Sequence, residues 1–406
     1  MRISQRAQRV EPFYVMELAK AASAMAAQAK PGDRSMIYLN IGEPDFTAPP
    51  LVMAAAERAI RSGSSQYTQA LGLPALREAI SGWYASRFGL SIDANRIVVT
   101  AGASAALQLA CLALIEAGDE VLMPDPSYPC NRQFVQAAEG RAVMIPSGPA
   151  QRFQLSAEQV EAHWNTASRG VLLASPSNPT GTSIKRDELE RIARFVRSKD
   201  GVTMVDEIYL GLSYEDEFGH SALGLPDGLG FDVISINSFS KYFNMTGWRL
   251  GWLVLPPALV PAVERLAQNL FICASTIAQH AALACFEPAS LTEYERRRSE
   301  FKARRDYFIP ELNRLGLSVP VMPDGAFYAW ADVTGLCQRW GIPPQGARPD
   351  EGGSWALAFE LMKRCQIAAT PGRDFGSADP GRYLRFSTAN SMAQLREAVS
   401  RLEQAL

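Results

Sequence analysis

Paired cysteines, long apolar runs and an excess of one charge are all scarce in this 406-residue chain. The six cysteines are scattered, with no Cys-x-x-Cys pair and no clustering with the three histidines. This scatter argues against a structural zinc site or a disulfide framework, so we expect no metal. The longest apolar run, residues 252–263, is broken by prolines and is too short to span a bilayer. A formal charge of -2 gives no signal for nucleic acid or anionic membrane as a partner.

The first 30 residues carry scattered arginines with no continuous apolar segment after them. A secretory signal needs such a segment, so none is expected here. The alanine-rich part of this stretch predicts an amphipathic helix. A cytoplasmic location is the resulting expectation.

Lysine is also rare, because seven lysines stand against thirty-three arginines. Six of the lysines lie in helical or turn patterns, where a solvated charge is the natural interpretation. Lys241 is different, since it follows a predicted strand and stands between Ser240 and the pair Tyr242-Phe243. Partial desolvation there would lower the pKa of the amine and make it nucleophilic, which an arginine cannot become. Taken alone, however, such a lysine more often forms a surface ion pair.

From about residue 96, short aliphatic runs alternate with turns and helical stretches such as 103–115 and 185–198. Seven runs predict strands, at residues 96–100, 120–124, 141–146, 171–175, 202–206, 232–238 and 249–255. This alternation predicts an α/β fold whose seven-stranded, mostly parallel sheet is sandwiched by helices. Near residue 286 the pattern changes to a long charged helix followed by short strands, which predicts the start of a smaller α+β domain. The Gly/Pro-rich segment 341–354 predicts an exposed loop.

Open α/β sheets bind ligands beyond the carboxyl ends of their strands, and several polar residues are predicted there. Ala103 and Ser104 follow the first strand at a helix start, where backbone N–H groups suit a phosphate. Asn178 follows the strand 171–175, and Asp206 ends the strand 202–206 with Tyr209 three residues later. Each of these has a simpler structural interpretation when taken alone: a cap, a proline turn or an N-cap aspartate.

The whole set of residues matches the needs of an aldehyde cofactor with a pyridine ring and a phosphate. Lys241 would bond to the aldehyde, and Asp206 would hold the ring nitrogen protonated, making the ring an electron sink. Asn178 and Tyr209 could hydrogen-bond the ring hydroxyl. The remaining candidates would bind the phosphate or lie next to the cofactor: Ala103, Ser104, Ser238, Ser240 and Arg249.

Ten motifs in order give the chain a resemblance to the class I/II aminotransferases of fold type I, the pyridoxal phosphate enzymes typified by aspartate aminotransferase. They are NIGEPDF (40–46), YTQALGLPALREAI (67–80), TAGASAAL (100–107), PDPSYP (124–129), SPSNPTG (175–181), DEIY (206–209), SFSKYFNMTGWRLGW (238–252), GAFYAW (325–330), PGRDFG (371–376) and YLRFSTAN (383–390). Each motif is weak alone, but the ordered set covers nearly the whole chain.

The resemblance implies further roles for individual residues. It aligns Tyr128 with the aromatic residue that stacks on the pyridine ring, and Tyr67 with a tyrosine that reaches the phosphate in a neighbouring subunit. It aligns Arg385 with the arginine that binds the substrate α-carboxylate, which the backbone of Gly42 would also touch. It also implies a homodimer with shared active sites. The large cofactor-binding domain would be 46–285, and the small domain would combine 1–45 with 286–406.

Two features depart from the family pattern and bear on the substrate. Asn131 stands where many relatives have an aromatic residue, so the pocket there is expected to be more open or more polar. The loop 341–354 is longer than usual. Phe13, Tyr14 and Phe327 offer apolar surface and no second arginine is evident for a side-chain carboxylate, which favours a neutral or aromatic amino acid.

The predicted function is therefore a pyridoxal 5′-phosphate-dependent transaminase that moves an amino group from an α-amino acid to a 2-oxo acid. A β/γ-lyase would use the same lysine and electron sink, and remains an alternative. A non-catalytic effector-binding module is a second alternative. It is disfavoured because no helix-turn-helix segment precedes the motif at Asn40 and the charge is slightly negative.

Overall fold

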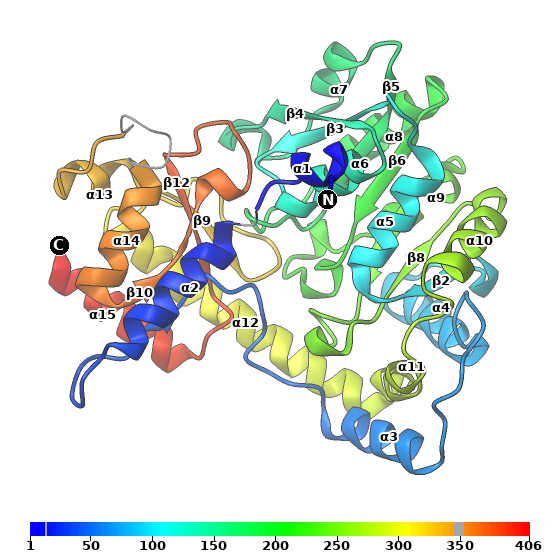
Figure 1. Ribbon diagram of the computed structural model, residues 1–406, viewed down its shortest axis with the longest axis horizontal. Coiled ribbons are helices and arrows are strands. Elements are labelled where there is room, and N and C mark those ends of the chain that lie inside the picture. The colour runs from blue at the N-terminus through cyan, green and yellow to red at the C-terminus, as the bar shows by residue number, and fades with distance from the viewer. Residues whose placement is uncertain (13, 345–352) are drawn as a thin grey trace.

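Seven strands form the largest sheet of the molecule, in the computed structural model that describes residues 1–12, 14–344 and 353–406 (Figure 1). Their order across the sheet is β2-β8-β7-β6-β5-β3-β4. Their bounds are β2 (Ile97–Thr100), β3 (Glu120–Asp125), β4 (Arg141–Pro146), β5 (Ser168–Ala174), β6 (Val202–Asp206), β7 (Ile234–Ser238) and β8 (Gly251–Val254). Only β8 runs antiparallel to its neighbours, so the predicted mostly parallel sheet is confirmed.

Two predicted strand starts are wrong by two residues. Asp232 belongs to the short helix α9 (Leu229–Asp232), so β7 begins at Ile234. Arg249 was expected to start the last strand, but its φ is 54°, the left-handed region, which cannot continue a strand. It ends a 3₁₀ turn, Thr246–Trp248, through which the chain reverses before entering the antiparallel strand β8.

Helices cover both faces of the sheet because side chains alternate along each strand. Successive residues Met204 and Val205 of β6, for example, join different apolar cores. One core includes side chains of α5 (Gly102–Leu114), α6 (Pro129–Ala137) and α10 (Val260–Leu270). The other includes α7 (Ala157–His163) and α8 (Arg186–Ser198). A third core lies at the β2–β8 end against α3 (Pro50–Arg61), α4 (Pro74–Phe88) and α11 (Thr276–Leu283).

Two smaller sheets and their helices form the rest of the molecule, on the left in Figure 1. Strands β9 (Tyr328–Asp332), β11 (Thr370–Pro371) and β12 (Tyr383–Ser387) form an antiparallel sheet in the order β11-β12-β9. Strand β1 (Ile37–Tyr38) pairs in parallel with β10 (Ile367–Ala368), which joins the two ends of the chain. Their apolar core includes side chains of α2 (Tyr14–Ala27), α12 (Pro288–Arg314), α13 (Thr334–Arg339), α14 (Gly353–Cys365) and α15 (Met392–Ala405).

The long helix α12 was expected from the charged pattern after residue 286, and it runs from the α11 side of the molecule to the small sheets (Figure 1). The short helix α1 (Gln5–Arg9) lies against α6 of the large sheet, where Arg6 pairs with Glu139. Of the predicted loop 341–354, residues 345–352 lie outside the described residues. No helix among the described residues is long and apolar enough to cross a membrane.

Candidate active site

A cavity of about 460 Å³ opens between the large sheet and the small sheets, and twelve of the thirteen predicted site residues line it. They are Gly42, Ala103, Ser104, Tyr128, Asn178, Asp206, Tyr209, Ser238, Ser240, Lys241, Arg249 and Arg385. The exception is Tyr67, whose relative exposure is 79% and which lies outside this cavity. The structure therefore brings these residues to one cavity, with the exception of Tyr67.

One side of the cavity, which we call the sheet wall, comes from consecutive strand exits. It consists of Ala103, Ser104, Asp206, Ser238, Ser240, Lys241 and Arg249. Strands β2, β6 and β7 end at this edge. Because β8 runs the other way, its first residue, Gly251, pairs with the last residues of both β2 and β7. The turn before β8 therefore brings Arg249 to the same edge.

Lys241 is half-buried, and its Nζ donates a 2.6 Å hydrogen bond to the carbonyl oxygen of Gly42. Burial lowers the pKa of this amine from its ordinary value to about 8. Glu43 and Asp206 act against burial in setting this pKa, while Arg385 and Arg249 act in the same direction as burial. A large fraction of the amine is therefore neutral near pH 8, as a nucleophile or base requires.

Asp206 is buried at the end of β6, and its Oδ1 accepts a hydrogen bond from the backbone N–H of Ile208 at 3.1 Å. Burial raises the pKa of this carboxyl to about 7. The adjacent Glu207 also raises it, while Lys241 lowers it. A cation that binds in the cavity beside Asp206 would lower the pKa of this carboxyl and keep it ionised. The ionised carboxylate would in turn stabilise the cation.

The start of α5 forms a cradle of donors beside Arg249. No side chain among the described residues caps this helix, so its first backbone N–H groups keep their donor capacity. Gly102 has a φ of 79°, and a Cβ there would lie 2.7 Å from Nη2 of Arg249. A Cβ on Gly251 would lie 2.7 Å from the backbone nitrogen of Ala103. The absence of these two Cβ atoms lets several donors converge at one place. They are the backbone N–H groups of α5, the hydroxyls of Ser104, Ser238 and Ser240, and the guanidinium of Arg249. This donor set fits a phosphate.

The facing side of the cavity, which we call the opposite wall, consists of Val15, Met16, Ala19, Asn40, Ile41, Gly42, Tyr328 and Arg385. The guanidinium of buried Arg385 donates at 2.8 Å to Oδ1 of Asn178 and to the carbonyl oxygen of Asn40. Its Nε is buried with no partner among the described residues. This unused donor is a fitting partner for an anionic oxygen.

Two tyrosine hydroxyls meet deep in the cavity, since those of Tyr209 and Tyr328 are 2.6 Å apart. Both side chains are buried, and burial raises the pKa of each phenol, so both stay protonated and can donate. Burial likewise raises the pKa of Tyr128. The guanidinium of Arg385 lies 4.5 Å from the ring centroid of Tyr328. One cavity is thus lined by an amine that is partly neutral near pH 8, a buried carboxyl and protonated phenols, together with the Arg385 guanidinium.

Three expectations about the substrate side were wrong. Asn131 is buried on α6 and does not line the described cavity, so it neither opens that pocket nor makes it polar. Tyr14 packs edge-on against Trp355 instead, and Phe327 lies buried behind the lining residues. Phe13 lies outside the described residues.

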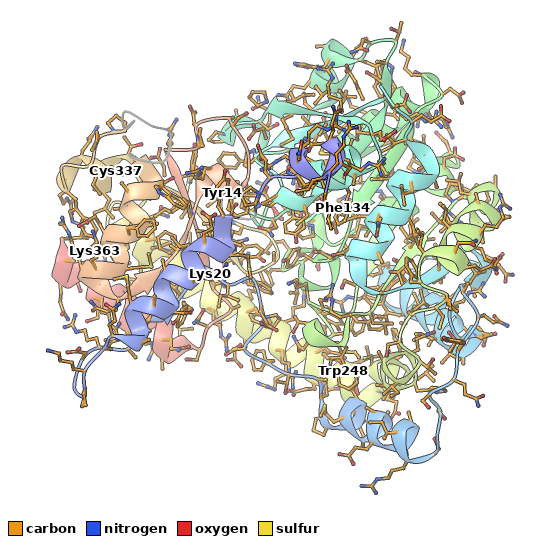
Figure 2. The ribbon with its side chains drawn as sticks, in the orientation of Figure 1. Tyr14, Lys20, Phe134, Trp248, Cys337 and Lys363 are labelled. Carbon is orange, nitrogen blue, oxygen red and sulfur yellow. The ribbon has the colours of Figure 1, made fainter. Side chains whose placement is uncertain are left out.

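Sequence reasoning missed most of the opposite wall. Asn40 and Tyr328 stand inside quoted motifs, and Asn40 is fully buried with both side-chain polar atoms unpartnered among the described residues. The apolar lining from α2, Val15, Met16 and Ala19, had no signal beyond helical spacing. Figure 2 shows Tyr14 at the end of α2 that points toward the large sheet, with Lys20 farther along the helix.

Comparison with known proteins gives the same result along the whole chain. The family model for aminotransferase class I and II matches residues 34–402. The chain is similar to valine–pyruvate aminotransferase of Mycobacterium tuberculosis, with 36% identity over 97% of this chain and 96% of that protein. It is similar to aromatic-amino-acid aminotransferase 2 of Thermococcus litoralis, with 31% identity over 100% of this chain and 98% of that protein.

A solved structure of Thermus thermophilus aspartate aminotransferase, a single mutant, superposes with a TM-score of 0.88 at 31% identity. The match covers all of both chains. Fold, site and sequence agree, and the chain belongs to the class I and II aminotransferases, enzymes that use pyridoxal 5′-phosphate to move an amino group between an amino acid and a 2-oxo acid.

Proposed function

We propose that this aminotransferase prefers a neutral or aromatic amino acid as its amino donor. The observation that carries the proposal is the lining of the opposite wall, where Val15, Met16, Ala19 and Ile41 present apolar side chains. Among the described lining residues, the only guanidinium groups are those of Arg249 and Arg385. In this proposal Arg249 binds the cofactor phosphate and Arg385 binds the substrate α-carboxylate. No arginine of this lining is then left for a side-chain carboxylate. The valine–pyruvate and aromatic names of two similar proteins agree with this preference.

The sheet wall would hold the cofactor by its phosphate and its ring nitrogen. The start of α5, with Ser104, Ser238 and Arg249, would bind the phosphate through N–H and O–H donors. Ser240 lines the same end of the cavity. Asp206 would accept a hydrogen bond from the ring nitrogen and keep that nitrogen protonated.

Three other side chains would position the ring, Tyr128 against its face and Asn178 and Tyr209 at its hydroxyl. The Tyr209 phenol can donate because burial keeps it protonated at neutral pH. Pyridoxal 5′-phosphate, when bound, supplies an electron-withdrawing pyridinium that stabilises negative charge at the substrate Cα.

Lys241 would have two tasks, bonding to the cofactor's aldehyde carbon and later moving a proton. With the cofactor and substrate bound, the neutral Nζ of Lys241 would be the base that accepts a proton from the substrate Cα. The ammonium group so formed would be the acid that gives this proton back. A pKa near 8 suits both directions, because an amine in that range gains and loses a proton easily at physiological pH.

Arg385 would bind the substrate α-carboxylate, with the backbone of Gly42 beside it. The planar guanidinium can offer two parallel donors to a carboxylate, and its partnerless Nε provides one of them. Such a grip orients the Cα–H bond toward Lys241, and orientation of this kind raises the rate of a proton transfer.

We also propose a homodimer with Tyr67 as the residue that crosses to the partner's phosphate site. Its 79% exposure in the single chain is what such a role requires. Exposed apolar side chains of Leu51, Met53 and Ile60 on α3 would be covered in the dimer. In the same proposal, residues 46–285 form the cofactor-binding domain, and 1–45 with 286–406 form the domain that closes on the substrate.

A panel of amino acids, each mixed with purified holoenzyme and either 2-oxoglutarate or pyruvate, tests the proposal. We expect new amino acid to form fastest from neutral or aromatic donors, with kcat/KM at least about tenfold above aspartate. Aspartate as the best donor would contradict the preference. Release of ammonia without a new amino acid would identify a lyase instead.

A further inference from the structure

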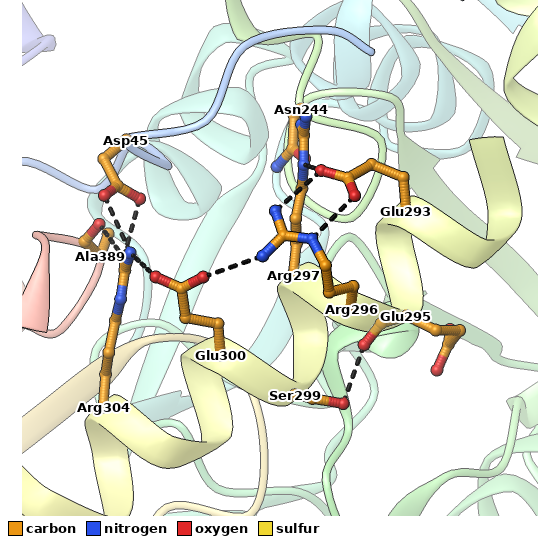
Figure 3. Close-up of polar contacts among 10 residues, drawn as sticks. All are labelled: Asp45, Asn244, Glu293, Glu295, Arg296, Arg297, Ser299, Glu300, Arg304 and Ala389. Atoms are coloured by element: carbon orange, nitrogen blue, oxygen red, sulfur yellow. Dashed lines mark hydrogen bonds and ion pairs between the residues drawn. The ribbon is translucent and has the colours of Figure 1, made fainter. Parts of the chain in front are cut away.

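Two arginines of α12 reach from that helix into the segments that carry active-site residues (Figure 3). Arg297 is one of them, and only 9% of its surface is exposed. One nitrogen, Nη1, donates to the carbonyl oxygen of Thr47 at 2.5 Å and to Oδ1 of Asn244 at 2.8 Å. Its Nε donates to Glu293 at 2.7 Å, on the preceding turn of α12. A single buried guanidinium thus joins two segments that are distant in sequence.

Asn244 connects Arg297 to the main chain of Lys241. Its side-chain Nδ2 donates to the carbonyl oxygen of Lys241 at 2.9 Å, and its backbone N–H donates to the same oxygen at 3.2 Å. Asn244 is buried and has a φ of 52°, so the chain turns sharply there. The side chain held by Arg297 is therefore the one that fixes the backbone of Lys241.

Thr47 connects Arg297 to the other end of the Lys241 side chain. It lies five residues after Gly42, whose carbonyl oxygen accepts from Nζ of Lys241. Between them, Asp45 pairs through both carboxylate oxygens with Arg304 of α12, at 2.7 and 2.9 Å. Arg304 also donates to the carbonyl oxygen of Ala389, four residues past Arg385. The contacts form a closed loop from Arg297 through Asn244, Lys241, Gly42 and Thr47 back to Arg297.

We propose that Arg297 is a positioning residue that fixes where the Lys241 amine lies, by tying the Asn244 turn to the Thr47 segment. The inference rests on the assignment of Lys241 as the amine that bonds the cofactor and moves the proton. A lysine side chain is long and flexible, so its reach depends on a fixed backbone. Arg297 acts on both anchors of that side chain, the backbone at one end and the Gly42 carbonyl at the other.

The adjacent Arg296 provides a matched control on the same helix. Its side chain is 55% exposed and pairs with Glu293 and Glu300 of α12. Substituting either arginine by methionine removes one charge and one partner of Glu293. Only Arg297→Met also releases Asn244 and Thr47.

The first measurement uses the cofactor-free protein and follows the pH dependence of Lys241 acylation, read by peptide mass mapping. We expect the Lys241 pKa to rise in Arg297→Met from about 8 toward that of an exposed lysine, because the loosened amine gains water. Asn244→Gly should raise it too; glycine tolerates the positive φ, and this change leaves every charge in place. Arg296→Met should titrate as the unchanged protein does.

The second measurement uses the holoenzyme and separates kcat from KM. We expect kcat to fall about tenfold in Arg297→Met and Asn244→Gly, with KM for the amino acid within about twofold, since misplacement of the base slows proton transfer. Arg297→Lys should recover part of kcat, because it keeps a donor at this position.

The inference is overturned if Arg297→Met and Asn244→Gly keep the Lys241 pKa and kcat of the unchanged protein per folded molecule. It is also overturned if Arg296→Met shows the same changes. Should Arg297→Met fail to fold, Asn244→Gly decides the matter alone. Lys241→Ala separates this inference from the proposed function: covalent cofactor capture in that variant would refute the role of Lys241 itself.

Discussion

The two sides of the cavity are built in different ways. The sheet wall takes its residues from the ends of neighbouring strands, whose spacing is set by backbone hydrogen bonds. The opposite wall combines residues of the paired strands β9 and β12 with residues of the segment 40–42 and of α2. Of these, the residues of α2 are placed by the packing of helix side chains. In the proposed function, the cofactor chemistry therefore belongs to a sheet edge set by backbone hydrogen bonds, while substrate choice depends in part on a helix placed by side-chain packing.

Loss of Lys241 should have the largest effect, because this one amine of the sheet wall is proposed both to bond the cofactor and to move the proton. We expect Lys241→Ala to lower kcat by at least about 10³ for every amino acid, in line with the loss of a general base. In the unchanged protein, borohydride should fix the cofactor to Lys241, as mass mapping would show. A colourless protein that takes up no added cofactor would contradict the assignment.

The pH dependence of cofactor capture follows from the lowered pKa of Lys241. Only the neutral amine reacts with an aldehyde, and it predominates above a pKa of about 8. The rate of covalent capture by the cofactor-free protein should therefore rise through about pH 8, where half of the amine is neutral, and level off above it. Stopped-flow absorbance measures this, and a rate still rising at pH 10 would indicate an unperturbed lysine.

Asp206→Ala should leave the cofactor bound through Lys241 and the phosphate site but remove the partner of the ring nitrogen. We expect kcat to fall by about 10²–10³ for all substrates alike, as for loss of one preorganised electrostatic contact. Single-turnover kinetics would measure the effect. Near-normal turnover would show that the sheet wall does not need its carboxylate.

Arg385→Lys tests the opposite wall, where binding should suffer more than chemistry. Lysine cannot offer two parallel donors, so we expect KM for the amino acid to rise roughly ten- to hundredfold while cofactor uptake is unchanged. Arg382→Lys is the matched control, because Arg382 is half-exposed and pairs with Asp332 away from the cavity. Equal effects of the two substitutions would deny Arg385 its special role.

Met16→Ala should have a smaller and selective effect, since it removes apolar surface from the opposite wall. We expect kcat/KM for large apolar donors to fall up to about tenfold, while alanine as donor is little affected. Met322→Ala, which shortens an exposed methionine outside the cavity lining, is the control. An unchanged donor ranking would place the side-chain subsite elsewhere in the cavity.

Glu207 lies directly behind the sheet wall and should affect stability and its pH dependence. Its buried carboxylate accepts from Ser221, Ser235 and the backbone of Ala222, and burial raises its pKa to about 7. The folded state therefore holds a proton that the unfolded chain has lost, so this contribution is full below pH 4.5 and disappears as pH rises through 7. Between pH 5 and 8 the unchanged protein should lose on the order of 2 kcal/mol of its free energy of unfolding through this group, and Glu207→Gln should not. Denaturant unfolding of both proteins across this pH range measures the difference. If the two pH profiles ran parallel, folding would not shift the pKa of Glu207.

The strands and most of the sheet-wall residues could be predicted because their signals are local. A strand such as 202–206 is a short apolar run, and Asp206 follows from its position at the end of that run. Arg249 was expected on a strand because sequence patterns do not show where a chain reverses. Asn131 and Tyr14 were misplaced for a related reason, since whether a side chain faces a cavity depends on what packs against it.

The sequence by itself determined the mostly parallel sheet and most of the polar residues at its strand exits, because local apolar runs form strands whose backbone hydrogen bonds align their ends. Only the tertiary structure decided which side chains of α2 and residues 40–42 face that edge, and that Arg297 links the backbone of Lys241 to the Gly42 segment. Contacts between segments so far apart in the chain depend on how helices and sheets pack, and no local pattern records that packing.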